Sequence, residues 1–330
     1  MAITISVLDT TPVTLATEKS DVTAAARSAL RDSVKLAQRA EELDYHRVWY
    51  TEHHGMPIAS SATAVVIGHV ATQTSKIRLG AGGVMLPNHA PLVIAEQFGT
   101  LEALHPGRID LGLGRAPGSD QATMRALRRD FSAADTFPSD VVELQRYLTG
   151  KRGNSAVRPI PGEGANVPLF ILGSSLFGAQ LAARLGLPYA FASHFVPNGL
   201  QQALETYRSE FTPSEQLAKP YAMAAVNLVA ARTFPEAQEQ FTAALRSRVR
   251  LFAAPGGRAD LSDEQVDSYL ATPGGQRIAS MLRYTALGGG RQVREYLDEF
   301  ATETGIDELL VAPLALTGAD RLTALKLARG

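Results

Sequence analysis

KIRLGAGGVM (residues 76–85) and RIDLGLGRA (residues 108–116) are the two runs that decide the fold. Both have the apolar character of buried strands, and the segment 91–104 between them has the pattern of a helix, so they predict a strand–helix–strand unit. Gly82 and Gly83 interrupt the first strand. Glycine inside a strand typically marks a bulge, a bend, or the close approach of a ligand or another backbone.

The same alternation of strands and helices runs along the whole chain. Eight strands followed by helical stretches, with no low-complexity linker, favour one (β/α)8 barrel, a TIM barrel, over residues 1–330. A doubly wound sheet is the alternative, but the first strand–helix turn, LDTTPVT, lacks the glycine-rich dinucleotide fingerprint of such sheets. Strands are expected at 3–9, 46–54, 76–85, 108–116, 169–175, 189–195, 221–231 and 307–315, and helices at about 22–43, 60–74, 91–104, 119–150 (interrupted near Phe137-Pro138), 199–211, 234–252 and 290–304.

Composition narrows the class of partner. With 45% hydrophobic residues, 20% charged residues and a net charge of -1, the chain has no charge excess that would favour nucleic acid or a membrane surface, so small molecules are the expected partners. The absence of cysteine excludes disulfides, thiolate nucleophiles and thiolate metal sites. With no targeting pattern at the N-terminus and no segment of membrane-spanning length, we expect a soluble cytoplasmic protein.

Unusual residues gather where the expected strands end. Ligands and catalytic groups of a (β/α)8 barrel lie at the C-terminal ends of its strands, which makes these positions the candidate site. Five consecutive strand ends carry polar or backbone-exposing residues, namely Glu52-His53-His54, Gly82-Gly83, Gly114-Arg115, Gly173-Ser174-Ser175 and Ser193-His194.

Each of these residues also has a purely structural interpretation. His53 and His54 are adjacent and point to opposite sides of a strand, which argues against a shared metal ion but leaves structural hydrogen bonding open. Arg115 is compatible with a surface ion pair, and Gly173–Ser175 with a turn and a helix N-cap. Alternatively, Arg115 and the Gly173–Ser175 turn could together hold a phosphate, because the first N–H groups of a helix bind anions.

Three segments carry a resemblance to a known family. WYTEHH (49–54), the block GAGGVMLPNHAPLVIAEQFGTLEALHPGRIDLGLGRAPG (80–118) and FILGSS (170–175) resemble the bacterial luciferase-like flavin-dependent monooxygenases, in their single-chain branch. The resemblance extends over essentially the whole chain. It implies a (β/α)8 barrel that binds FMNH2 from a separate NAD(P)H:flavin reductase and forms a C4a-(hydro)peroxyflavin with O2. That species oxygenates a small organic substrate, and a homodimer is expected.

The resemblance also implies roles for individual residues. His53 matches the catalytic histidine, and Gly82–Gly83 match a non-prolyl cis peptide beneath the flavin ring. Arg115 matches a phosphate-binding arginine, and Gly173–Ser175 match a loop that contacts the ring and the phosphate. Gly114 stands where the light-emitting members have a cysteine, so thiol effects near the flavin are not possible here.

The remaining expectations concern the substrate, the rim of the site and the rival functions. Thr10, His194 and Asn227 are tentative substrate contacts, and no metal is expected. The segment 253–280 is interpreted as an irregular insertion that acts as a lid, because the reactive flavin must be shielded from water. An F420-dependent hydride-transfer enzyme and a non-catalytic flavin-binding protein remain the alternatives.

Overall fold

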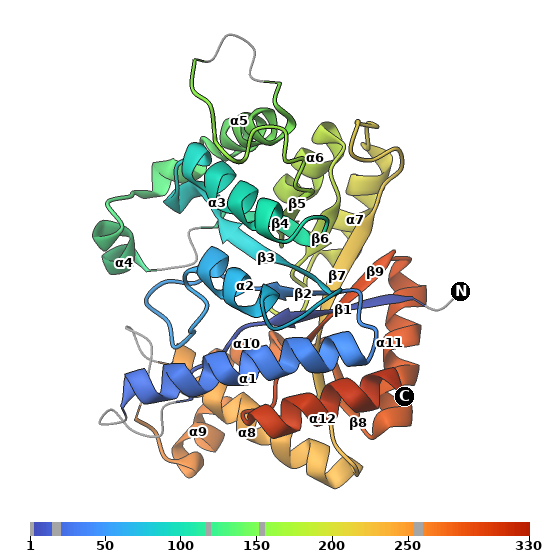
Figure 1. The fold of residues 1–330 in the computed structure, drawn as a ribbon. Helices are drawn as coiled ribbons and strands as arrows, with labels where there is room; N and C mark the ends of the chain where they lie inside the picture. Colours follow the sequence, from blue (N-terminus) through green and yellow to red (C-terminus); the bar gives the residue numbers. More distant parts are fainter. Residues whose placement is uncertain (1–2, 15–20, 117–119, 152–155, 254–259) are drawn as a thin grey trace.

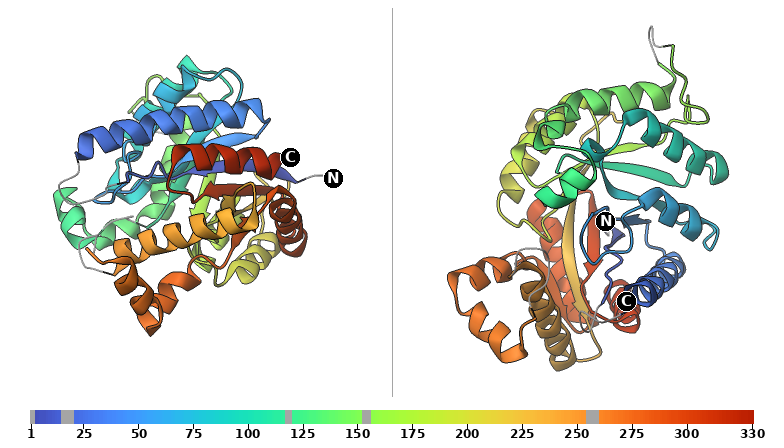
Figure 2. Two further views of the ribbon diagram at one scale, coloured as in Figure 1. Left: turned by 90° about the horizontal axis from the view of Figure 1, so that it is seen from below. Right: turned by 90° about the vertical axis from the view of Figure 1, so that its left-hand side faces the viewer.

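The strands close into a parallel barrel that is surrounded by helices (Figures 1 and 2). Around the ring the order is β6-β5-β4-β3-β2-β1-β9-β7, and β7 pairs again with β6, so eight strands close on themselves. This closure confirms the expected (β/α)8 barrel and shows that the doubly wound alternative is wrong. The computed structural model describes residues 3–14, 21–116, 120–151, 156–253 and 260–330.

The elements have the following bounds. The strands are β1 (Thr4–Asp9), β2 (Arg47–Tyr50), β3 (Arg78–Met85), β4 (Ile109–Gly114), β5 (Leu169–Gly173), β6 (Tyr189–Phe191), β7 (Ala222–Ala230), β8 (Thr285–Gly288) and β9 (Glu308–Pro313). The α-helices are α1 (Val22–Glu42), α2 (Thr63–Ala71), α3 (Pro91–Leu104), α4 (Gln121–Ala126), α5 (Phe137–Thr149), α6 (Leu176–Leu185), α7 (Leu200–Ser209), α8 (Phe234–Phe252), α9 (Asp263–Leu270), α10 (Pro273–Ser280), α11 (Gly290–Thr304) and α12 (Gly318–Arg329), with short 3-10 turns η1 (Leu86–Asn88) and η2 (Phe131–Ala134).

One strand was missed by the pattern. β7 pairs through its first residues with β6 and, further along, through Asn227–Ala230 with Thr285–Gly288, which forms β8. The four residues of β8 are too few to show a periodicity. The helical stretch expected over 119–150 consists of α4, η2 and α5, and the interruption expected near Phe137-Pro138 is the start of α5, where Pro138 occupies the first turn.

The expected irregular insertion at 253–280 is mostly helical. Ser262 caps α9 through a capping box with Gln265, and Thr272 caps α10. Part of the expected insertion, 254–259, lies outside the described residues. Figure 2 shows the remainder, drawn in orange, projecting with α8 from one side of the barrel.

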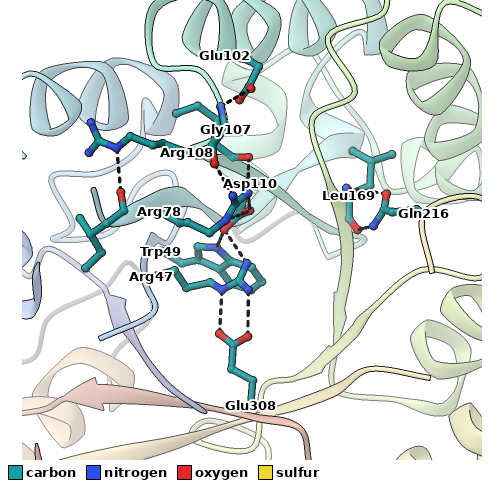
Figure 3. A network of polar contacts seen from close by, with 12 residues as sticks. Arg47, Trp49, Arg78, Glu102, Gly107, Arg108, Asp110, Leu169, Gln216 and Glu308 are labelled. Atoms are coloured by element: carbon teal, nitrogen blue, oxygen red, sulfur yellow. Dashed lines mark hydrogen bonds and ion pairs between the residues drawn. The ribbon is translucent and has the colours of Figure 1, made fainter. Parts of the chain in front are cut away.

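Buried charges fill the interior at the N-terminal ends of the strands. Arg47 pairs with Asp110 at 2.7 Å and donates a further hydrogen bond to Glu308 at 3.1 Å (Figure 3). Asp110 also pairs with Arg78 at 2.5 Å and accepts a hydrogen bond from Trp49 at 3.2 Å. Every buried charge in this network therefore has a partner of opposite sign, and we call Arg47, Arg78, Asp110 and Glu308 the lower charge network.

The glycines of β3 make room for a large side chain above that network. Trp49 is fully buried inside the barrel together with Leu8. A Cβ on Gly82 would lie 2.8 Å from the Cβ of Trp49 and 3.0 Å from Leu8, and one on Gly80 would lie 2.6 Å from the carbonyl oxygen of Asp110. These glycines are therefore explained by packing inside the barrel, before any ligand is considered.

Among the described residues, none of the helices combines the length and the apolar character needed to cross a lipid bilayer.

Candidate active site

The candidate residues meet in one cavity at the C-terminal ends of the strands. Successive residues of a strand alternate between its two faces, so the inward series that begins with Arg47 and Trp49 continues to Thr51 and His53. The cavity has a volume of about 2060 Å³, well above the roughly 300–1,000 Å³ of most ligand sites, and so has room for a cofactor and a substrate together. All candidate residues line it: Thr10, His53, Gly82, Gly83, Gly114, Arg115, Gly173, Ser174, Ser175, His194 and Asn227.

His53 presents a free basic nitrogen. Its Nδ1 lies against the backbone carbonyl of Glu52, which can only accept, so Nδ1 carries the proton and Nε2 is unprotonated. Within the described residues Nε2 has no hydrogen-bond partner. Burial lowers the pKa of His53 below its usual value, and the Glu52 carboxylate only partly opposes this effect. His53 is therefore neutral near pH 7 and can accept a proton from a ligand in the cavity.

The neighbouring carboxylate of Glu52 binds two other histidines. Glu52 Oε1 accepts hydrogen bonds from Nε2 of His54 at 2.9 Å and from Nε2 of His89 at 2.7 Å. Burial alone would raise the pKa of Glu52, but these hydrogen bonds hold it below its usual range. The ligand atoms of the three residues lie within 4.8 Å of one another, close enough to hold a metal ion. His89, which follows strand β3, was not expected at this site, because in the sequence only His53 and His54 are adjacent.

The peptide bond between Gly82 and Gly83 is cis, as the resemblance implies. Both residues line the cavity. A Cβ on Gly83 would lie 2.8 Å from the carbonyl oxygen of Gly112, so the protein backbone leaves no space for a side chain. Gly114 and Gly173 differ from Gly83 in this respect. The nearest atom to an added Cβ would lie 3.2 Å away at Gly114 and 3.6 Å away at Gly173. Protein packing alone therefore does not require glycine at Gly173.

Groups of the kind that bind anions lie where β4 and β5 end, and we call Arg115 and the first turn of α6 the anion cradle. Ser175 occupies the N-cap position of α6, but its side chain makes no capping hydrogen bond, so the first N–H groups of the helix remain available. Arg115 lies with its guanidinium carbon 4.2 Å from the ring centre of Phe177, a residue in the first turn of α6. Arg115 has no carboxylate partner in the described part of the chain, so the surface ion-pair interpretation has no support here.

The three tentative substrate residues behave differently. Thr10 borders the cavity at the end of β1. Asn227 is almost fully buried, and its amide donates hydrogen bonds to the carbonyl oxygens of His194 at 2.8 Å and Tyr284 at 3.3 Å, so its side chain fixes the loop after β6. Nδ1 of His194 is buried and has no hydrogen-bond partner. Burial, with smaller contributions from Arg248 and His53, lowers the pKa of His194 to about 3.

Arg248 is the cavity residue that sequence reasoning overlooked. It lies in the middle of RSRVR (246–250) on α8. In the sequence, such a run of arginines predicts a solvent-exposed face of a helix. In the structure it lines the cavity. The sequence does not show which arginine of this run lacks an acidic partner.

The geometry defines a class of protein. A closed (β/α)8 barrel with a large cavity at the C-terminal ends of its strands, lined by a neutral histidine and the anion cradle, is the arrangement of a barrel enzyme. The family model for luciferase-like monooxygenases matches residues 9–308. The chain therefore belongs to the luciferase-like monooxygenase family.

Individual relatives agree with this assignment. A luciferase-like monooxygenase of Escherichia coli is 48% identical over 305 residues, which cover 92% of this chain and 91% of the relative. An N-acetyl-S-alkylcysteine monooxygenase of Bacillus subtilis is 37% identical over 255 residues, covering 74% of this chain and 75% of the relative. The crystal structure of apo-MsnO8 is 32% identical, covers 99% of this chain and 98% of its own, and has a TM-score of 0.85.

Two more distant solved structures share the fold alone. One is the oxygenating constituent of 3,6-diketocamphane monooxygenase from Pseudomonas putida in complex with FMN, at 16% identity and a TM-score of 0.69 over 99% of this chain and 96% of that chain. The other is an F420-dependent secondary alcohol dehydrogenase, at 14% identity and a TM-score of 0.70 over 99% of this chain and 98% of that chain. The same barrel thus accommodates either cofactor.

Proposed function

We propose that this protein is a monooxygenase that uses FMNH2, supplied by a separate NAD(P)H:flavin reductase, and O2 to oxygenate a small organic substrate. The observation that carries the proposal is the presence in one cavity of the Arg115–α6 anion cradle and of neutral His53 with a free Nε2. A flavin mononucleotide has a phosphate that suits the cradle and a flat ring that suits a wall of glycine backbone.

Different residues of this chain would bind the phosphate, contact the ring and transfer the proton. Arg115 and the first N–H groups of α6 would hold the phosphate, and the backbone at Gly82–Gly83 and Gly173 would face the ring. Bound reduced FMN supplies two electrons to O2, so that one oxygen atom enters the substrate and the other leaves as water. His53 Nε2 would accept or return the proton that this exchange requires.

Two features of the assembly belong to the same proposal. We infer that residues 260–280, the described helical part of the expected insertion 253–280, act as a lid, since Leu261 and Asp263 border the cavity and α9 is bound to α8 through Arg246 and Arg250. Cross-linking α9 to the barrel through introduced cysteines should then change the yield of hydrogen peroxide.

We also propose a homodimer, which light scattering in solution tests directly.

The decisive experiment is stopped-flow mixing of the FMNH2-loaded protein with oxygen. We expect flavin reoxidation to be slower than that of free FMNH2 and the time course to change in His53→Ala. With a substrate present, less hydrogen peroxide should be released. N-acetyl-S-methylcysteine is the first compound to test, because one relative is named for that class.

Anaerobic titration separates the alternatives. Binding of reduced F420 but not FMNH2, with no oxygen consumption, would replace the proposal by F420-dependent hydride transfer. Tight binding of oxidised FMN without any turnover that depends on His53 would indicate a non-catalytic flavin-binding protein.

A further inference from the structure

Helix α8 directs three arginines toward the cavity, and they differ in their partners. Arg246 pairs with Asp263 at 2.7 Å and with Asp267 at 2.6 Å, and Arg250 pairs with Asp263 at 2.5 Å. These contacts join α8 to α9. Arg248, which lies between them in sequence, has no carboxylate partner among the residues that the structure describes. Its charge is therefore not used to hold the two helices together.

Two aromatic side chains lie beside Arg248. Its guanidinium carbon lies 5.9 Å from the ring centre of Phe195, and that ring lies 6.1 Å from the ring of Phe252. Burial lowers the pKa of Arg248 to about 10, so the side chain is still charged near neutral pH. A partly desolvated guanidinium without a counter-ion is costly, and an anion that enters the cavity would remove this cost.

His194, which also lines the cavity, carries a second unsatisfied group. His194 Nδ1 is buried without a hydrogen-bond partner, while Asn227 holds the backbone of His194 in place. His53, His194 and Arg248 all line the cavity, and the charges of Arg248 and His53 contribute to the lowered pKa of His194. A neutral imidazole and a guanidinium together offer the hydrogen-bond donors that a carboxylate accepts.

The flavin phosphate is not the expected anion at this position. Its cradle, at Arg115 and α6, follows β4 and β5, whereas α8 follows β7, with β6 in between around the ring. A flavin held at Arg115 therefore leaves Arg248 for a different molecule.

We propose that Arg248 and His194 form a subsite for the carboxylate of the substrate, and that this protein acts on small apolar molecules bearing a carboxylate group. The inference rests on the proposed function, because it takes the flavin to occupy the Arg115 side of the cavity. Phe195 and Phe252 would contact the apolar part of the substrate, and the carboxylate would fix which of its atoms faces His53.

The test is calorimetric titration of the flavin-free protein with matched pairs of ligands. Butanoate, octanoate, phenylacetate and N-acetylmethionine are each compared with the corresponding primary amide. We expect at least one carboxylate to bind about tenfold or more tightly than its amide. Arg248→Gln should abolish this preference and Arg248→Lys should keep part of it. Arg291→Gln, the same change at an exposed arginine of α11 that does not line the cavity, should leave the preference intact.

Stability and flavin binding provide the remaining readouts. Arg248→Gln removes an unpaired charge, so its melting temperature should equal or exceed that of the unmodified protein, which excludes misfolding as the cause of lost binding. The ratio of FMN to riboflavin affinity should be unchanged in Arg248→Gln, whereas a reduced ratio would mean that Arg248 binds the flavin phosphate. A panel without any carboxylate preference, or a preference that survives Arg248→Gln, would overturn the inference. If the protein binds no flavin but keeps the preference, the proposed function fails and the anion subsite stands.

Discussion

The two ends of the barrel interior neutralise their charges in different ways. At the N-terminal ends of the strands, Arg47 is enclosed by Asp110 and Glu308, and the charges cancel within the protein (Figure 3). At the C-terminal ends, Arg115 and Arg248 border the cavity without a carboxylate partner among the described residues. The charges at the N-terminal ends of the strands are therefore paired within the protein. Arg115 and Arg248 at the C-terminal ends gain a partner of opposite charge only when a ligand binds.

This difference separates the residues that stabilise the fold from those that bind ligands. Breaking a buried ion pair leaves an uncompensated charge and is strongly destabilising. A polar group that waits for a ligand contributes little to folding, so its removal should cost binding rather than stability. Changes at the lower charge network and at the cavity should therefore be distinguishable in the same set of measurements.

The largest effect is expected at the lower charge network. Glu308→Gln removes the charge that faces Arg47, and we expect the free energy of unfolding to fall by about 3 kcal/mol, measured by urea denaturation. Glu295→Gln is the control, since its pair with Arg291 is exposed and 3.8 Å apart; it should change stability by less than about 0.5 kcal/mol. Equal effects in the two variants would show that the buried network does not stabilise the barrel.

The next effect concerns the anion cradle. Arg115→Gln should raise the Kd for FMN about tenfold to a hundredfold, the loss of one charge-assisted contact to phosphate. Riboflavin lacks the phosphate, so its affinity should be unchanged. Fluorescence titration measures both ligands. Equal weakening of FMN and riboflavin would place the phosphate elsewhere.

A smaller effect follows from the titration of His53. Burial holds the pKa of His53 below its usual value of 6.5, so the neutral imidazole is present above the lowered pKa and is lost as the pH falls through it. The rate of coupled oxygenation should be nearly constant above about pH 7.5 and should approach a tenfold fall per pH unit once the pH is below the lowered pKa. His194, with a pKa of about 3, does not titrate in this range.

His54→Gln provides the control for this pH dependence. It removes the neighbouring imidazole that binds Glu52 but leaves Nε2 of His53 free, so the acid limb should persist. An acid limb whose midpoint lies above pH 6.5, or that disappears in His54→Gln, would show that His53 is not the titrating group.

Much of this comparison could be predicted from strand alternation. Once β2 is placed in a barrel, Arg47, Trp49 and His53 must share its inner face, with the arginine at one end and the histidine at the other. The cis bond at Gly82–Gly83 followed from the resemblance. These features depend on short-range spacing, which the sequence displays directly.

The rest depends on contacts between distant segments. The acidic partners of Arg246 and Arg250 lie on α9, beyond a segment whose helices were not expected, so the isolation of Arg248 was not visible in the sequence. The tight packing of the β3 glycines against Trp49 and other parts of the barrel was likewise not expected, because it depends on contacts between strands.

The smallest predicted effect tests whether the flavin ring contacts the backbone at Gly173, at the end of β5. A Cβ on Gly173 would lie 3.6 Å from the Cα of Gly178, an ordinary contact, so Gly173→Ala should change the free energy of unfolding by less than about 0.5 kcal/mol. If the flavin ring contacts this backbone, the added methyl group should weaken FMN and riboflavin alike, by about threefold to tenfold. Gly83→Ala is the matched contrast, because its Cβ would lie 2.8 Å from the Gly112 carbonyl oxygen and should destabilise the barrel itself. Unchanged affinity for both flavins in Gly173→Ala would mean that the ring lies away from β5.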